Sequence, residues 1–275
     1  MIDVRNLFLE SRFKESKKED LRKITAFIKI ILNMTTAVPL KLIGKLDEDG
    51  SYPIAIIDRL KKTRLISIGV GNNIRFDESM ASMGVQVWLY DHTVNLKIKK
   101  KYFSKMQFFK IGLHGKDKFP NCLTLTEIIN QSGNANLYDH TILKIDCEGS
   151  EWDALLETNI DTLVEIDQIC GEFHELDKIV DHEKSEKYLK VIQKLSEIFV
   201  ISYIAVNNYT PMVKLDNGLN WPFTIELHLL NKKLLKDFKL TEIMPRLPSE
   251  LGFKKSNWHL KENLNLENWY KERKL

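Results

Sequence analysis

The sequence is poor in cysteine, and its three cysteines do not lie at a spacing that would pair them. Cys122, Cys147 and Cys170 are odd in number and far apart. Neither a disulfide framework nor the closely spaced thiols of a structural zinc site fits this pattern. A reducing compartment is the simplest one for such a chain, so we expect a cytoplasmic protein.

An excess of charge of either sign is also lacking. The 41 lysine and arginine residues nearly balance the 38 acidic residues, which leaves a net charge of +3. This balance does not require nucleic acid or an anionic membrane surface as a partner, and we expect no nucleic-acid partner. Hydrophobic residues at 43% and charged residues at 29% are typical of a soluble globular protein.

Long hydrophobic runs are absent as well. The first ten residues carry charges where a signal peptide would need an apolar run. The most apolar segment, 24–43, is interrupted by Lys29, Asn33 and Pro39. We therefore expect a buried amphipathic helix there and no transmembrane segment.

The 275 residues divide into three predicted parts. Residues 1–41 form an N-terminal helical extension, which could dock on the main domain or pair two subunits in a homo-oligomer. Residues 42–235 form the main domain. Residues 236–275 form a C-terminal tail with a terminal helix around 264–270.

The stretch 64–93 contains the strongest local pattern. It reads in order as a strand at 65–68, a turn with Gly69 and Gly71, a helix at 76–83, a strand at 85–90, and Asp91. Glycine lets the backbone approach a ligand where a Cβ atom would clash. Asp91 follows Gly71 by 20 residues, a separation that suits an acid binding the hydroxyls of a ribose. The pattern predicts the first half of a nucleotide-binding α/β unit.

Further apolar runs predict five more strands, with helices between most of them. We expect these strands at 106–111, 141–145, 166–173, 199–206 and 223–230. The last two are joined only by a loop with Pro211, Gly218 and Pro222, and a short connection favours antiparallel neighbours. The predicted fold class is therefore α/β, with a Rossmann-like sheet of seven strands that is mostly parallel and has an antiparallel last strand.

Smaller signals complete the predicted plan. The Asp49-Gly50 turn predicts a hairpin or lid-like loop near 42–56 that could fold over the mouth of the glycine turn. Thr124, followed three residues later by Glu127, predicts a capping box at a helix N-terminus. The basic run 97–102 could bind phosphate, but a solvated helix is the favoured interpretation.

Acidic side chains gather where the predicted strand 141–145 ends. Asp146, Glu148, Glu151 and Asp153 fall within eight positions at a strand-to-helix turn. Ligands bind at the carboxyl ends of strands in open α/β sheets, and Asp91 also lies at such an end. Further along, Glu172 and His174 are two residues apart, so both are expected on one side of an extended chain.

Six stretches, in register, resemble the S-adenosylmethionine-dependent methyltransferases of the FkbM type. They are G-K-L-D-E-D-G-S-Y, I-S-I-G-V-G-N-N-I-R-F-D, L-Y-D-H-T, L-K-I-D-C-E-G-S-E-W, G-E-F-H and I-E-L-H-L-L-N-K, within residues 42–235. Ser51 stands where that group has a second glycine, and Asn73 where an Asp is common. The resemblance implies the seven-stranded methyltransferase sheet. It also implies an enzyme that O-methylates a sugar or similar small polar hydroxyl acceptor in surface polysaccharide biosynthesis.

The resemblance also assigns roles to residues. Ten are implied to bind S-adenosylmethionine: Gly69, Gly71 and Asn72 at the methionine part, Phe76 and Asp77 framing that pocket, Asp146 near the sulfonium, Asp91 at the ribose, His92 beside the adenosine, and Gly112 and Leu113 near the adenine. Four are candidates for the catalytic chemistry: His174, Asp146, Glu148 and Glu172.

The expected chemistry leaves alternatives open. A hydroxyl is a weak nucleophile and needs a base or a metal. His174 is the expected base, because an imidazole pKa near ~6.5 suits proton removal at neutral pH. No metal ligand is assigned, although Asp146 with Glu172 could instead hold a divalent cation such as Mg²⁺. His174 could equally be structural, and Glu148 could serve only the dipole of the following helix.

Two other classes of function also fit parts of the pattern. The glycine spacing and Asp91 match an NAD-dependent oxidoreductase, but Ile74 occupies the place of the third glycine. The departures at Ser51 and Asn73 leave room for a non-catalytic member that keeps the fold for binding or assembly.

Overall fold

The computed structural model describes residues 18–44, 50–56, 62–115, 119–207, 210, 212–214 and 220–238. The expected terminal helix around 264–270 and the first 17 residues of the helical extension lie outside these ranges.

The centre of the molecule is a seven-stranded sheet in the order β10-β13-β9-β8-β3-β4-β5. β13 pairs antiparallel with both neighbours, and the remaining pairs are parallel. The order and the single reversed strand are those of the Rossmann-like methyltransferase sheet, so the predicted fold class is confirmed. The strands are β3 (Thr63–Ile68), β4 (Gln86–Tyr90), β5 (Met106–Phe109), β8 (His140–Ile145), β9 (Gln168–Phe173), β10 (Phe199–Val206) and β13 (Ile225–Asn231).

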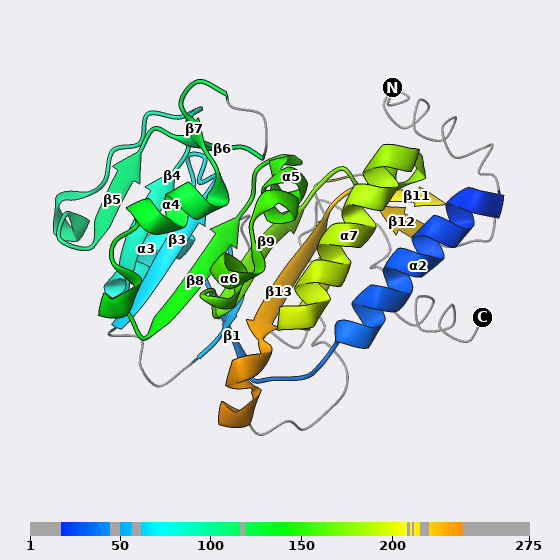
Figure 1. Cartoon of the computed structure of the whole chain (residues 1–275). Coiled ribbons are helices and arrows are strands. Elements are labelled where there is room, and N and C mark those ends of the chain that lie inside the picture. The colour runs from blue at the N-terminus through cyan, green and yellow to red at the C-terminus, as the bar shows by residue number, and fades with distance from the viewer. Residues whose placement is uncertain are drawn as a thin grey trace.

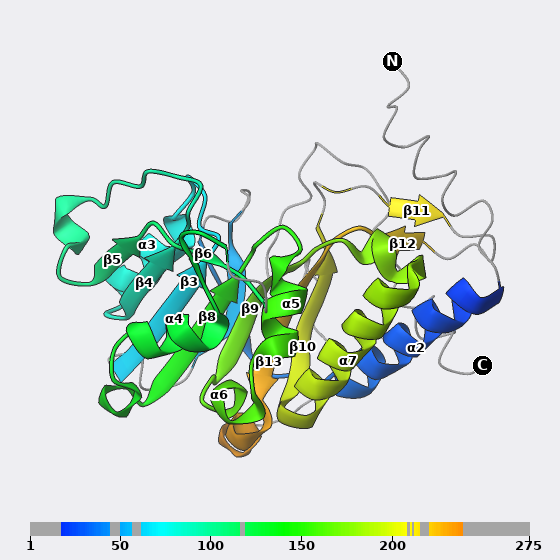
Figure 2. The ribbon, with the colours of Figure 1, turned by 45° about the horizontal axis from the view of Figure 1, so that its top comes forward.

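Helices cover both faces of this sheet. α2 and α7 lie side by side on one face near β10 and β13, as Figure 1 and Figure 2 both show. The α-helices are α2 (Lys18–Met34), α3 (Arg75–Ser82), α4 (Leu125–Gln131), α5 (Ser150–Glu157), α6 (Ile160–Val164) and α7 (His182–Ile198). The 3₁₀ turns are η2 (Lys100–Tyr102), η3 (Ala135–Leu137), η4 (Leu176–Val180) and η5 (Lys232–Asp237).

Two hydrophobic cores lie on opposite faces of the sheet, because successive strand residues point to opposite sides. Ile66 and Ile68 of β3 belong to the core that also contains residues of α2, α4, α5 and α7, whereas Leu65 belongs to the core that contains residues of α3. No helix in the described part of the chain is long and apolar enough to cross a bilayer.

Among the described residues, three two-stranded pairs lie outside the main sheet. The predicted hairpin is confirmed: β1 (Leu40–Ile43) pairs antiparallel with β2 (Tyr52–Ala55). The others are β6 (Gly112–Leu113) with β7 (Cys122–Leu123), which is parallel, and β11 (Met212–Lys214) with β12 (Asn220–Pro222), which is antiparallel.

A buried chain of polar side chains ties the hairpin to the sheet. The amide of Gln168 in β9 accepts from Ala55 N at 2.8 Å and donates to Ala55 O at 3.0 Å. Its oxygen lies 2.9 Å from His228 Nε2, and His228 Nδ1 lies 2.5 Å from Ser202 Oγ. One chain of contacts therefore connects β2, β9, β13 and β10.

The segment after α2 lies along β10. Thr35 forms a parallel bridge with Ile201, and Thr36 N donates to Ile201 O at 2.8 Å. This segment brings the chain from α2 along β10 and on to the hairpin.

One predicted helix is wrong. Residues 94–99 have no regular structure, and the basic run forms only the short 3₁₀ turn η2. Lys97 and Lys101 would stand one helical turn apart, and like charges at that spacing destabilise a helix.

Candidate functional site

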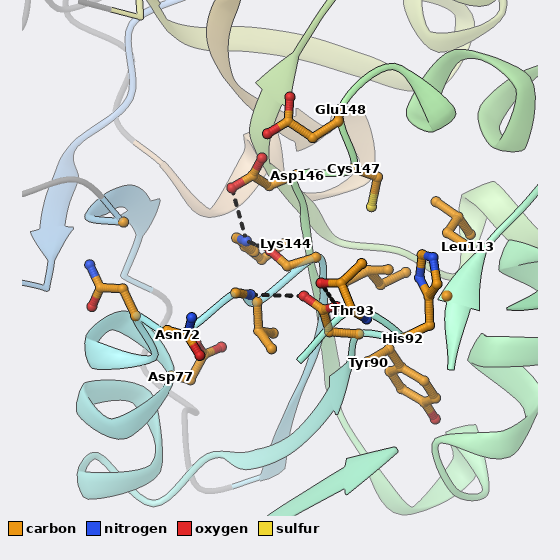
Figure 3. Close-up of a pocket in the computed structure, with 18 of the residues that line it drawn as sticks. Asn72, Asp77, Tyr90, His92, Thr93, Leu113, Lys144, Asp146, Cys147 and Glu148 are labelled. Carbon is orange, nitrogen blue, oxygen red and sulfur yellow. Dashed lines mark hydrogen bonds and ion pairs between the residues drawn. The ribbon is translucent and has the colours of Figure 1, made fainter. Parts of the chain in front are cut away.

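A cavity of about 370 Å³ opens at the carboxyl ends of β3, β4 and β8. All ten residues that the resemblance assigned to the cofactor line this cavity. The carboxyl ends of the strands are also where an open α/β sheet binds its ligand. Figure 3 shows Asp146 and Glu148 at one end of this cavity and Tyr90 and His92 at another.

The glycine turn brings β3 close to β8. Gly69 has φ +71°, and a Cβ atom there would lie 1.7 Å from the carbonyl oxygen of Asp146. Both the left-handed backbone and this close approach require glycine. Gly71, with φ +55°, then directs its N–H toward the end of β4.

Asp91 receives the N–H of that turn. Gly71 N donates to Asp91 Oδ2 at 2.9 Å, while Thr93 donates to Oδ1 through its backbone N at 2.7 Å and its hydroxyl at 2.6 Å. Burial acts to raise the pKa of Asp91, but these hydrogen bonds outweigh it and lower the pKa. A fixed carboxylate of this kind can accept hydrogen bonds from a ligand's hydroxyls.

His92 and β6 form the wall beyond Asp91. A Cβ atom on Gly112 would lie 2.3 Å from His92 Nδ1, so the imidazole can reach this position only because residue 112 is glycine. Leu113 is buried and lines the cavity beside it. The two together offer an apolar and aromatic surface to a ligand.

Lys144 is a cavity residue that the sequence interpretation missed. It is buried in β8, and its Nζ donates to Gly69 O at 2.6 Å and to Asp146 Oδ2 at 3.3 Å. Burial opposes its charge, yet Asp146 and Asp77 raise the pKa of Lys144. The only signal was a lysine inside an otherwise apolar strand.

Asp77 approaches the same lysine from α3. Burial raises the pKa of Asp77 to about 6, although the charge of Lys144 acts in the opposite direction. Its Oδ1 is buried and forms no hydrogen bond of good geometry with the described residues, although the nearby Ser67 hydroxyl also acts to lower the pKa of Asp77. A buried acceptor without a donor is costly, so Asp77 leaves a position for a ligand's N–H or O–H group.

The hairpin contributes Tyr52, which was also missed. Its hydroxyl donates to Asp146 Oδ2 at 3.1 Å, and its ring meets Phe76 edge-on at 5.3 Å. Burial, followed by the charge of Asp146, raises the pKa of Tyr52, so its hydroxyl remains a donor. β2 thus forms one wall of the cavity.

His174 lies beside Asp146 and is oriented by Glu151. The buried Glu151 accepts from His174 N at 2.6 Å, and its Oε1 lies 3.1 Å from His174 Nδ1. Trp152 Nε1 also donates to His174 O at 2.7 Å. The sequence placed Glu151 in an acidic group but did not predict that it would hold this ring.

Three carboxylates surround the other ring nitrogen of His174. Nε2 lies 3.4 Å from Glu172 Oε2, 3.7 Å from Asp146 Oδ1 and 3.8 Å from Glu148 Oε2. All four candidates for catalysis therefore lie close together: Asp146 and Glu148 line the end of the cavity, and the buried Glu172 and His174 lie behind them. Glu172 and His174 also share one side of the chain, as their spacing predicted.

The electrostatics of His174 differ from those expected of a base. Burial acts to lower its pKa, but hydrogen bonds with Glu151 and Glu172 raise it to about 10. In this arrangement the ring is protonated at neutral pH and donates hydrogen bonds.

The turn that carries Glu148 has an unusual backbone. Glu148 has φ +51° and Gly149 has φ +106°, and Gly149 is the N-cap residue of α5. The Glu148 side chain is 89% exposed and extends toward His174. Glu148 therefore lies beside the His174 imidazole as well as near the N-terminus of α5, so an interaction with the helix dipole does not account for all of its surroundings.

No family model and no curated protein matches the sequence. Among solved structures, the fold is similar to the fibrillarin pre-rRNA processing protein of Methanococcus jannaschii, with a TM-score of 0.33 and 8% sequence identity. The match covers 64% of this chain and 70% of that protein. It concerns the course of the backbone, and no activity follows from it.

Proposed function

We propose that this chain is an S-adenosylmethionine-dependent methyltransferase. Its proposed reaction is O-methylation of a sugar or similar small polar hydroxyl acceptor in surface polysaccharide biosynthesis. The observation that carries the proposal is the bond from Gly71 N to Asp91 in a cavity that continues to Asp146. The acceptor class comes from the resemblance of the sequence motifs.

The cavity has the features that such a cofactor needs. Asp91 offers a carboxylate to a ribose diol, and His92 with Leu113 offers a flat apolar surface to a base. Near the glycine turn, the buried Oδ1 of Asp77 can accept a hydrogen bond from an amino group. Asp146 would then lie at the reacting end.

The cofactor would supply a methyl group on a positively charged sulfur. Around that position the chain would align the acceptor hydroxyl and keep water out, which is the main contribution of such a site to an in-line displacement. Asp146 and Glu148 would accept hydrogen bonds from the acceptor, and one of these carboxylates would take up the hydroxyl proton as the methyl group moves to the acceptor oxygen and S-adenosylhomocysteine leaves. In the metal-free chain His174 would donate a hydrogen bond, because its pKa of about 10 leaves its ring protonated.

Binding of the cofactor tests the proposal directly. Titration calorimetry should detect binding of S-adenosylmethionine to the full chain, and Asp91→Asn should weaken it at least tenfold, since a hydrogen bond to a charged group contributes about 1.5–3 kcal/mol. Asp139→Asn is the matched control, because Asp139 is a partly exposed carboxylate near Lys62 and does not line the cavity. Binding of NADH without affinity for S-adenosylmethionine would support an oxidoreductase instead.

Turnover separates an enzyme from a binding protein. With nucleotide sugars as acceptors and a labelled methyl group, His174→Ala should lose methyl transfer while cofactor binding persists. If the variant and the parent chain transferred methyl groups at the same rate, His174 would have no role in the reaction.

A further inference from the structure

We propose that Asp146, Glu148 and His174 hold a divalent cation at the end of the cavity, with Mn²⁺ as the ion that best matches the donors. The binding site does not depend on the proposed methyl transfer. Its use by an acceptor does rest on that function and is treated separately below.

The three donors already lie close to the spacing that a metal requires. One ligand atom from each residue can be chosen so that all lie within 4.8 Å of one another. Nε2 of His174 is 3.7 Å from Asp146 Oδ1 and 3.8 Å from Glu148 Oε2. Two donors bound at about 2.1 Å lie between roughly 3.0 and 4.2 Å apart, so small side-chain shifts suffice.

The second observation is the support for the imidazole. Glu151 is fully buried, accepts from the backbone of His174 and faces its Nδ1 at 3.1 Å. A carboxylate on one ring nitrogen fixes the tautomer and directs the other nitrogen to a metal, which is how metal-binding histidines are commonly held. Here Nε2 is the atom that faces the carboxylates, and a bound cation would take the place of the proton that Nε2 carries in the metal-free chain.

The charges around the ring also match a cation. Glu172 adds a further carboxylate, with its Oε2 3.4 Å from Nε2 and 2.5 Å from the amide nitrogen of Asn207. Asp146, Glu148, Glu151 and Glu172 thus place four carboxylates about one imidazole, and Lys144 contacts Asp146 alone among them. A divalent cation would offset this negative charge.

The donor types select the ion. Carboxylate oxygens suit Mg²⁺, Ca²⁺ and Mn²⁺, whereas an imidazole suits Zn²⁺ and other transition metals. Mn²⁺ accepts both kinds of donor. If the chain is a methyltransferase, positions of the ion left open by the protein would bind two neighbouring oxygens, so the favoured acceptor would be a vicinal diol.

Mn²⁺ titration of the full, EDTA-treated chain tests the site, with free Mn²⁺ measured by electron paramagnetic resonance. We expect one site per chain, weakened at least about tenfold in Glu148→Gln and lost in His174→Gln. The control is His182→Gln, because His182 pairs with Glu186 at 3.4 Å on an exposed helix end and should not affect the site. Circular dichroism checks that each variant is folded.

Absence of a wild-type site, or unchanged Mn²⁺ binding in folded Glu148→Gln, would overturn the inference. Glu148→Gln is the decisive variant if His174→Gln does not fold, since the Glu148 side chain is 89% exposed. Asp91→Asn in the same assay separates this inference from the proposed function. That variant should keep the Mn²⁺ site and lose affinity for S-adenosylmethionine.

Discussion

Lys144 joins two parts of the site through a single ammonium group. Its Nζ binds the carbonyl of Gly69 and the carboxylate of Asp146, and its charge reaches Asp77. A lysine buried in a strand is stable only because these acceptors surround it.

Replacing this lysine should destabilise the fold. Lys144→Met would leave the charges of Asp146 and Asp77 without their cation, and we expect the free energy of unfolding to fall by about 3 kcal/mol. Urea denaturation at neutral pH measures this change. Lys110→Met is the control, because Lys110 is exposed and its Nζ donates to the neutral Asn95 side chain. A loss below about 1 kcal/mol would show that the ammonium is not needed.

Single residues could be predicted where position along the chain decides their role. Asp91 and Asp146 each follow an apolar run, so their place at a strand end could be derived from the sequence. Tyr52 could not, because its contact with Asp146 joins positions 94 residues apart. The pairing of Glu151 with His174 likewise depends on how α5 packs against the end of β9.

At the scale of elements, α2 packs against the tryptophan that binds the backbone of His174. Phe27 is fully buried, and its ring meets Trp152 at 6.3 Å and Trp221 at 5.9 Å. Trp152 in turn holds the carbonyl of His174. The apolar pattern of residues 24–43 predicted a buried helix, but α2 ends at Met34 and Leu40–Ile43 form β1 instead. The pattern also carries no information on which elements the helix contacts.

Removing the Phe27 ring from α2 should destabilise the fold. Phe27→Ala removes a buried ring, and a change of this kind lowers the free energy of unfolding by about 3–5 kcal/mol. Chemical denaturation provides the measurement, with Arg22→Ala on the exposed side of the same helix as the control. If both variants unfolded at the same urea concentration, α2 would not contribute to the core.

Helices were predicted best where local chemistry decides. The capping box is confirmed, with Thr124 accepting from Glu127 N and the Glu127 carboxylate accepting from Thr124 N. The basic run was predicted poorly, because solvation alone does not compensate for repulsion among its lysines. Strand ends also shifted by a few residues, as where β13 begins at Ile225 instead of the expected residue 223.

Across the whole molecule, acid should weaken the chain of contacts through His228. Burial lowers the pKa of His228 to about 3. In the unfolded chain His228 binds a proton as the pH falls through ~6.5, whereas in the native state it does so only at a pH of about 3. Stability is therefore lost as the pH falls between those values.

The expected loss from this residue is about 2 kcal/mol between pH 7 and pH 5. Urea denaturation at both pH values should show a smaller pH dependence in His228→Gln than in the parent chain. His182→Gln, which alters an exposed histidine, should retain the parent's dependence. If the free energy of unfolding depended on pH equally in His228→Gln and in the parent chain, His228 would not be a source of the acid sensitivity.

The order of the strands in the sheet could not be predicted from local hydrophobic patterns. Apolar runs located the seven strands, and the short last connection indicated the reversed one. That β3 lies between β4 and β8 follows from pairing across distant segments, and the sequence supplied it only through its family resemblance.

The segment that runs from α2 along β10 has a consequence for solubility. β10 is the longest strand and lies at one end of the sheet, where an open backbone would invite a strand of another molecule. Thr35 and Thr36 occupy part of that edge at Ile201. At the opposite end, β5 has only four residues, and a short strand is a poor template for aggregation. The two borders of the sheet thus discourage association by different means, one by being partly covered at Ile201 and the other by being short.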